Sequence, residues 1–154
     1  MALEIERKFL LSNDSWRAKA TGVQFRQGYL CTEPERTVRV RLEGEIGKLT
    51  IKGKVQGITR SEYEYQIPRD EAGALLDSLC RQPLIEKTRY RLEFAGQLWE
   101  VDEFHGLNAG LLVAEIELDS EDQPFERPAW LGAEVTAEPR YYNANLVKNP
   151  FTRW

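Results

Sequence analysis

The chain has 154 residues, of which 42% are hydrophobic and 30% are charged, and its formal net charge is −4. This length is typical of one domain with its own core, so we expect a single domain over residues 1–154. The acidic balance disfavours general affinity for nucleic acids, although a local group of cations can still bind an anion. No stretch approaches the roughly 18 apolar residues of a membrane span.

The two cysteines, Cys31 and Cys80, have no metal-ligand spacing and predict free thiols in a reducing compartment. The N-terminus carries acidic residues where a signal peptide needs a basic and then an apolar run. We therefore expect a cytoplasmic protein with no nucleic-acid or membrane partner. The sequence leaves open whether the protein is a homodimer.

The first expected element is a strand over residues 3–10, because apolar and charged residues alternate along it. Its charged face carries Glu4, Glu6 and Lys8. A Glu-x-Glu pair on one strand face is a reasonable ligand set for a cation that prefers oxygen, such as Mg²⁺, Ca²⁺ or Mn²⁺. The alternative is that these residues face water on an exposed sheet, and this one strand does not decide between them.

The same alternation recurs along most of the chain and is interrupted by turns that contain Gly or Pro. It predicts further strands at residues 23–31, 37–42, 48–52, 61–67, 85–94, 98–104 and 111–118. Residues 12–20 are expected to form a connection or a short helix, with Ser12, Asn13 or Asp14 as the N-cap. Residues 120–132 are expected to be irregular.

Two helices complete the predicted elements. Residues 70–81 carry four apolar side chains on one stripe, with Asp70 and Glu71 in the first turn, and this pattern is typical of a helix packed on a sheet. A short terminal helix is expected at residues 140–147, after Pro139. The fold class is therefore α+β, mainly antiparallel β.

Nearly every expected strand has one ionisable face and one apolar face. Polar faces of ordinary antiparallel sheets look toward water, but a pure Arg-x-Arg or Glu-x-Glu face places like charges side by side, which costs stability. We therefore expect about eight strands to close into a barrel with the charged faces inward and the two helices covering part of the outside. The expected inward residues are Lys8, Arg39, Arg41, Lys52, Lys87, Arg89, Arg91, Glu4, Glu6, Glu62, Glu64, Asp102, Glu115 and Glu117.

A bore with basic and acidic walls suits an extended and highly charged guest. Arg and Lys side chains bind phosphate oxygens, whereas carboxylates hold a divalent metal ion that bridges to other oxygens. The guest that uses both walls is a polyphosphate together with a divalent cation.

This series of motifs resembles the CYTH superfamily, also called the triphosphate tunnel metalloenzymes, and in particular its small bacterial, inorganic triphosphatase-like members. The motifs are Glu4-x-Glu6-x-Lys8, Arg39-x-Arg41, the Lys52 strand, Glu62-x-Glu64, Glu86-Lys87-Thr88-Arg89-Tyr90, Asp102, Glu115-x-Glu117, residues 132–136, and Arg140-Tyr141-Tyr142-Asn143. They occur in order over essentially the whole chain. The resemblance implies an eight-stranded tunnel that hydrolyses or cyclises triphosphates with Mg²⁺ or Mn²⁺.

The resemblance also implies roles for single residues. A first metal ion would be held by Glu4, Glu6 and Glu117, and a second metal site or its hydrated shell would be formed by Glu62, Glu64, Asp102 and Glu115. The triphosphate cradle would consist of Lys8, Arg39, Arg41, Lys52, Lys87 and Arg89. Arg91 and Tyr29 receive no firm role, and Lys48 and Lys54 are expected at the rim or in solvent.

The mechanism that follows needs a proton acceptor for the attacking water. Crowding among cations is expected to lower the pKa values of Lys52 and Lys87, so that one of them accepts the proton, with Glu64 as a helper. These three residues are the candidate catalytic groups.

Three functions compete for this site: hydrolysis of inorganic tripolyphosphate or an organic triphosphate, a class IV adenylate cyclase, and a non-catalytic polyphosphate-binding module. A cyclase needs a pocket for the base, and no adenine-reading cluster is evident. A pure binding module needs mainly cations, whereas this chain carries many carboxylates. We therefore expect a metal-dependent triphosphatase.

Overall fold

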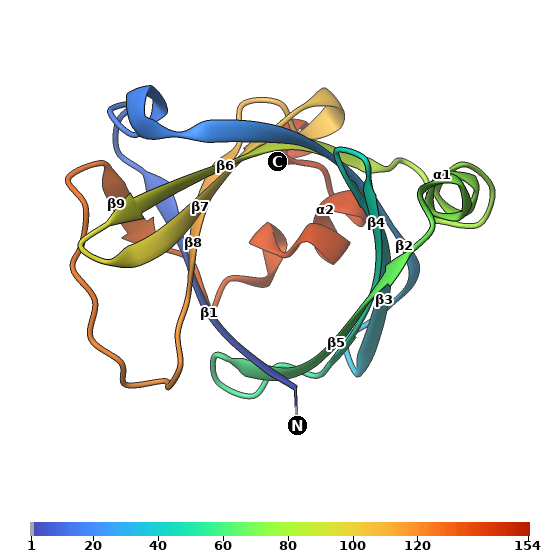
Figure 1. Ribbon diagram of the computed structural model, residues 1–154, viewed down its shortest axis with the longest axis horizontal. Coiled ribbons are helices and arrows are strands. Elements are labelled where there is room, and N and C mark those ends of the chain that lie inside the picture. The colour runs from blue at the N-terminus through green and yellow to red at the C-terminus, as the bar shows by residue number, and fades with distance from the viewer. Residues whose placement is uncertain (1) are drawn as a thin grey trace.

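Eight strands close into an antiparallel barrel around a central bore in the computed structural model, which describes residues 2–154 (Figure 1). The barrel strands are β1 (Leu3–Leu11), β2 (Thr21–Glu33), β3 (Arg36–Glu43), β4 (Ile46–Gly53), β5 (Thr59–Ile67), β6 (Ile85–Phe94), β7 (Gln97–Phe104) and β8 (Leu112–Glu117), and a ninth strand, β9 (Leu131–Glu134), is added beside β1. Their order in the sheet is β5-β4-β3-β2-β6-β7-β8-β1-β9. A further pairing of β5 with β1 closes the barrel, so the predicted eight-stranded barrel is confirmed.

Strand β1 closes the barrel because different parts of it pair with different neighbours. Residues 3–5 pair with β5, and residues 6–9 pair with β8. The far end of β1 then pairs with β9, a short strand whose first two residues lie in the stretch 120–132 that was expected to be irregular. Side chains alternate between the faces of a strand, and this places Glu4, Glu6 and Lys8 among the residues that line the bore.

Helix α1 (Arg69–Ser78) covers part of the outside of the barrel, as the apolar stripe predicted. Its buried Ala72 and Leu76 pack with Val40, which lies on the outward face of β3. The helix follows Pro68, and the acidic residues of its first turn complement the helix dipole. Elsewhere the outer face is covered by a cluster that includes Trp16, Trp99 and Trp130.

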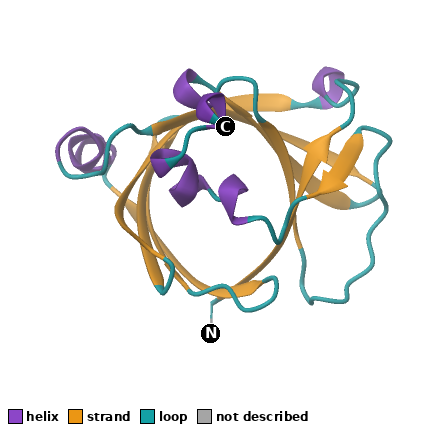
Figure 2. Ribbon diagram, turned by 180° about the vertical axis from the view of Figure 1, so that it is seen from behind, coloured by secondary structure: helices purple, strands orange, loops and turns teal. Residues whose placement is uncertain are grey.

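The second helix does not cover the outside, and this prediction is wrong. Helix α2 (Asn143–Lys148) lies across one end of the bore in both ribbon views (Figures 1 and 2). Its Leu146 and Val147 belong to a buried apolar cluster with the inward side chains of Ile85 and Phe104. The expectation placed the helix against the apolar outward faces of the strands, but this end of the bore is apolar too, at Ile85 and Phe104, and the helix packs there.

Short 3₁₀ turns fill several connections and account for smaller differences from prediction. They are η1 (Arg17–Lys19), η2 (Gly106–Asn108), η3 (Pro139–Tyr141) and η4 (Phe151–Arg153). The N-cap position of η1 is Trp16 rather than a predicted polar residue, and Asn13 instead accepts a hydrogen bond from the Ser15 backbone amide (3.0 Å). Among residues 2–154, none of the helices has the length and apolarity to cross a bilayer.

Candidate active site

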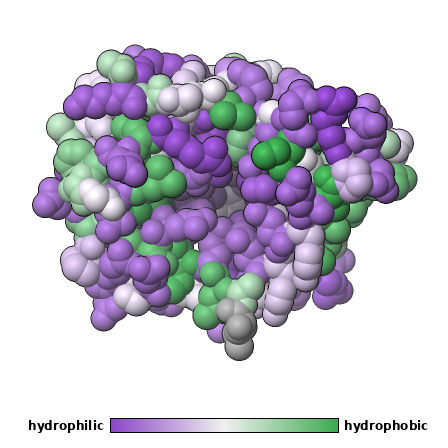
Figure 3. Space-filling view, viewed as in Figure 1, coloured by the Kyte–Doolittle hydropathy of each residue, from purple (hydrophilic) through white to green (hydrophobic). Residues whose placement is uncertain are grey.

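The bore contains one large cavity of about 960 Å³ whose walls carry the charged faces of the strands. The space-filling view shows it as a hollow bordered by hydrophilic residues (Figure 3). Among the residues predicted to point inward, all but the deeply buried Asp102 line this cavity. Lys48 and Lys54, expected at the rim or in solvent, line it as well, and Lys48 pairs with Glu43 (3.1 Å) and Glu64 (3.5 Å).

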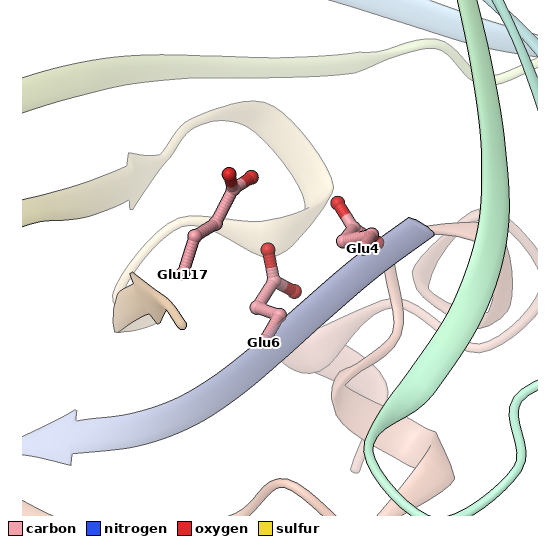
Figure 4. A group of neighbouring side chains, drawn as sticks. All are labelled: Glu4, Glu6 and Glu117. Atoms are coloured by element: carbon pink, nitrogen blue, oxygen red, sulfur yellow. The ribbon is translucent and has the colours of Figure 1, made fainter. Parts of the chain in front are cut away.

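Three carboxylates converge in this cavity. Glu4 and Glu6 come from β1, and Glu117 comes from β8 directly opposite Glu6 in the ladder. One carboxylate oxygen from each residue lies within 4.8 Å of the other two. Figure 4 shows the three side chains extending into the same space. A strand register that pairs Glu6 with Glu117 places like charges directly opposite each other, which is unfavourable by itself.

Cations neutralise this acidic group only in part. Lys52 Nζ lies 2.9 and 3.1 Å from the two oxygens of Glu4, and although burial acts to raise the pKa of Glu4, this ammonium lowers it to about 2. Burial and the neighbouring carboxylates of Glu115 and Glu4 raise the pKa of Glu6 well above its ordinary value. Burial and nearby carboxylates also raise the pKa of Glu117 to about 7. The group therefore has room for additional positive charge.

The donor chemistry of this group fits a divalent metal ion. Mg²⁺ and Mn²⁺ prefer carboxylate oxygen ligands, and the oxygens of Glu4, Glu6 and Glu117 approach one another without a cation to balance all their charge. The raised pKa values of Glu6 and Glu117 express the same deficit of positive charge.

The four carboxylates expected at a second metal site do not converge on one point. No other group of three possible ligands comes together in the part of the chain that the structure describes. Glu115 lies between Lys8 (3.8 Å) and Arg89 (3.4 Å). Glu62 pairs with Lys52 (3.3 Å), whereas Glu64 accepts a hydrogen bond from Thr50 Oγ1 (2.8 Å).

Asp102 differs most from a metal ligand. It is fully buried, and its oxygens accept hydrogen bonds from Lys87 Nζ (2.7 Å) and from Arg89 Nε and an Arg89 terminal nitrogen (2.8 and 2.9 Å). Burial acts to raise the pKa of Asp102, but these two cations hold it far below its ordinary value. The carboxylate thus orients the two cations.

The bore also has a basic wall, which adjoins the acidic group where Lys52 meets Glu4 (2.9 Å). Arg39 and Arg41 come from β3, Lys52 from β4, and Lys87 and Arg89 from β6. Arg39 Nε is buried without a hydrogen-bond partner among residues 2–154. Burial and the charges of Arg39 and Arg89 lower the pKa of Arg41 to about 10. Crowded, partly unpaired cations of this kind are stabilised by a bound anion.

Lys87 has the lowered pKa that the sequence predicted. Burial is the main cause, and Arg89 and Arg41 add to it, so that the pKa falls to about 7 despite the opposing effect of Asp102. Lys8 behaves differently, because Glu115 and Glu6 outweigh burial and raise its pKa. Thr50 and Lys48 outweigh burial at Glu64 and lower its pKa, which makes Glu64 a weaker base.

Four residues of the bore had no role assigned from the sequence: Arg91, Tyr29, Gln27 and Asn143. Arg91 Nε donates to Glu100 (2.9 Å), and Tyr29 is 5% exposed and lines the cavity beside the apolar end. Gln27 and Asn143 hydrogen-bond to the basic wall. The alternation in β2 puts Gln27 in phase with Phe25 and Tyr29, so the sequence carried a signal for Gln27. Asn143 belongs to the last motif of the family resemblance, but its contact with Lys87 follows only from the placement of α2 in the bore.

A closed antiparallel barrel with a charged bore is the structure that the CYTH resemblance implied, and the CYTH domain matches residues 2–148. The chain therefore belongs to the CYTH family. It is 52% identical over 151 residues to an inorganic triphosphatase of Acetivibrio thermocellus, covering 98% of this chain and 97% of that protein. It is 39% identical over 148 residues to an inorganic triphosphatase of Nitrosomonas europaea, covering 94% and 96%.

Solved structures agree with this assignment. A crystal structure of an inorganic triphosphatase superposes with a TM-score of 0.65 at 37% sequence identity, covering 93% of this chain and 96% of that one. A protein from Pyrococcus horikoshii superposes with a TM-score of 0.60 at 16% identity, covering 77% and 81%, and shares the fold.

Proposed function

We propose that the protein is a metal-dependent triphosphatase and that inorganic tripolyphosphate is its preferred substrate. The observation that carries the proposal is the presence of two charge groups in one cavity. Three carboxylates converge there and are only partly neutralised by Lys52, and the cavity is also lined by the arginines of the basic wall. The two full-length relatives named above are both inorganic triphosphatases, which supports the same activity.

In this proposal Glu4, Glu6 and Glu117 hold Mg²⁺ or Mn²⁺, and the bound cation would neutralise phosphate oxygens and polarise the bond that breaks. The remaining phosphate oxygens would be bound by four cations of the basic wall and by Lys8 of β1. The four are Arg39, Arg41, Lys52 and Arg89. Preorganised cations of this kind stabilise the charge that moves to the leaving phosphate in the transition state.

Lys87 is the proposed proton acceptor. A pKa of about 7 leaves a substantial neutral fraction at neutral pH, which is the condition for general-base catalysis. Its amine donates to Asp102 Oδ2 (2.7 Å) and Asn143 Oδ1 (3.1 Å), so the neutral amine keeps a lone pair for the proton of the attacking water. Lys52 is paired with Glu4 and Glu62 and is assigned to substrate binding.

Phosphate release tests this function when tripolyphosphate, ATP and thiamine triphosphate are compared in Mg²⁺ and in Mn²⁺. We expect the fastest release from tripolyphosphate and none after chelation of the metal. Cyclic AMP in the ATP reaction would favour the cyclase, and absence of turnover with all three substrates would favour a binding module.

The free thiols of Cys31 and Cys80 support a reducing compartment, so the cytoplasm is the proposed location.

A further inference from the structure

A buried series of hydrogen bonds connects helix α2 to the basic wall. Arg41 Nε donates to Gln27 Oε1 (2.8 Å), and Gln27 Nε2 donates to Asn143 Oδ1 (2.9 Å). Lys87 Nζ donates to the same Asn143 oxygen (3.1 Å). Gln27 is fully buried and Arg41 is 5% exposed, so water has little access to this series.

The donors at the two ends fix the direction of every bond in the series. Arg and Lys side chains donate hydrogen bonds and accept none when charged. Gln27 must therefore turn its oxygen to Arg41 and its amide nitrogen to Asn143. The Asn143 oxygen must then accept from both Gln27 and Lys87. The Asn143 oxygen thus acts on Lys87 directly and on Arg41 through Gln27. It shares this task with Asp102, which accepts from Lys87 (2.7 Å), and with Glu43, which accepts from Arg41 (3.3 Å).

Helix α2 is well placed to hold that oxygen still. Asn143 is its first residue, and the following turn carries Leu146 and Val147, both buried in the apolar cluster at the end of the bore. Close packing of this cluster restricts the movement of the helix. The adjacent Tyr142 lines the cavity and lies with its ring 5.4 Å from Lys8 Nζ.

We propose that Asn143 is a positioning residue for triphosphate hydrolysis, which aims the Lys87 amine directly and the Arg41 guanidinium through Gln27. The inference rests on the proposed function and deepens it, because it assigns a role in that reaction to a residue of α2. In this view the C-terminal segment completes the basic wall in addition to filling one end of the barrel. A purely structural alternative is that Asn143 only docks the helix.

Steady-state kinetics of Asn143→Ala with tripolyphosphate and Mg²⁺ separate these two roles. We expect kcat/KM to fall by about 10- to 100-fold, the effect of displacing catalytic groups by about an ångström, with both a higher KM and a lower kcat. Asn145→Ala is the matched control. Asn145 lies on the same helix, but its side chain donates to the Pro139 carbonyl (2.8 Å) rather than to the basic wall. Asn145 also lines the cavity, but its side chain bonds to a backbone carbonyl and not to a cation, so the control should change kcat/KM by no more than about twofold.

A double-mutant cycle with Gln27→Leu gives a readout that helix docking alone would not produce. If the two amides act as one series, the Gln27→Leu and Asn143→Ala effects on KM are less than additive, because either change already releases Arg41. Fully additive effects would overturn the positioning role. So would an Asn143→Ala protein that is folded by circular dichroism and has the kinetics of the Asn145→Ala control.

Asn143→Asp keeps the test decisive if the alanine variant does not fold. The carboxylate preserves both acceptor positions but adds a negative charge beside Lys87, so tripolyphosphate should bind more weakly, by about tenfold for a close like-charge neighbour. Isothermal titration of the metal-free protein with sodium tripolyphosphate measures this, and an unchanged Kd would contradict the placement of Asn143.

If the wild-type protein binds tripolyphosphate without hydrolysing it, the proposed activity fails while the positioning of the cradle is still tested. If it neither binds nor hydrolyses tripolyphosphate, both proposals fail.

Discussion

Asp102 and Glu117 are both carboxylates on neighbouring strands of one barrel, yet their surroundings are opposite. Asp102 lies opposite Arg89 in the ladder and accepts hydrogen bonds from two cations. Glu117 lies opposite Glu6. Its burial and the negative charges of nearby carboxylates raise its pKa to about 7. The comparison teaches that strand register decides which carboxylates stabilise the barrel and which remain available to a ligand.

Removal of Asp102 should have the largest effect on stability. Asp102→Ala leaves Lys87 and Arg89 buried with one partner fewer, and breaking a buried ion pair in this way costs about 3–5 kcal/mol. Urea denaturation of the metal-free protein measures the loss. Glu117→Gln is the paired control and should not destabilise that form, because it removes a repelled charge. Equal destabilisation by both changes would remove the distinction between the two carboxylates.

Removal of an unneutralised carboxylate should instead affect activity. Glu6→Ala is expected to lower metal-dependent turnover by more than about 100-fold, since loss of even an outer partner of a metal ligand costs 10- to 100-fold. The metal-free protein should keep its fold, because Glu6 repels its neighbours in that state. Near-normal turnover by the soluble variant would mean that these carboxylates do not bind the catalytic metal.

Arg39 tests the basic wall separately from the metal ligands. Arg39 lines the cavity, donates to Thr50 Oγ1 (3.2 Å) and lies 3.5 Å from Glu64. A guanidinium has five N–H donors, so others remain for a phosphate oxygen. Arg39→Ala should raise the KM for tripolyphosphate by about tenfold or more, the value of a hydrogen bond to a charged group. Arg36→Ala on the same strand is the control, because Arg36 is exposed and pairs with Glu33. A KM that is equally affected by both would count against the cradle.

The acidic group also predicts how pH and metal act together on stability. The pKa values of Glu6 and Glu117 are raised above their ordinary value of 4.5. The folded protein therefore holds more protons than the unfolded chain between about pH 4.5 and 7, and this contribution to stability is lost as pH rises through that window. A bound cation offsets the loss.

Thermal melts with and without Mn²⁺ check this expectation. The metal-induced rise in Tm should be larger at pH 8 than at pH 6, by a few degrees for about 1 kcal/mol in a chain of this size. In Glu117→Gln the difference between the two pH values should shrink. A rise in Tm that is the same at both pH values would show that metal and protons do not compete at this group.

Much of the barrel could be read from the sequence because alternation reports directly which side chains share a face. Glu4, Glu6 and Lys8 were placed together by this pattern, and all three line the cavity. The alternation does not predict which residues of two neighbouring strands lie opposite each other. A shift in register decides whether Glu117 faces Glu6 or a cation, and that depends on turns and on contacts across the whole sheet.

The C-terminal segment was the least predictable part for a related reason. A short helix was expected after Pro139, but the apolar cluster that receives Leu146 and Val147 includes inward side chains of distant strands. Strand β9 has only four residues and pairs with the end of β1, so its own pattern is too short to define it. Asn143 gained a role only through these long-range contacts.

The most direct test of the distinction between paired and unpaired carboxylates is a crystal structure of the protein grown with Mn²⁺, using the anomalous signal of the metal. We predict a peak among the carboxylates of Glu4, Glu6 and Glu117 and none beside Asp102, which should keep its bonds to Lys87 and Arg89. A metal ion on Asp102, or an acidic group that stays without a metal at saturating Mn²⁺, would contradict this account.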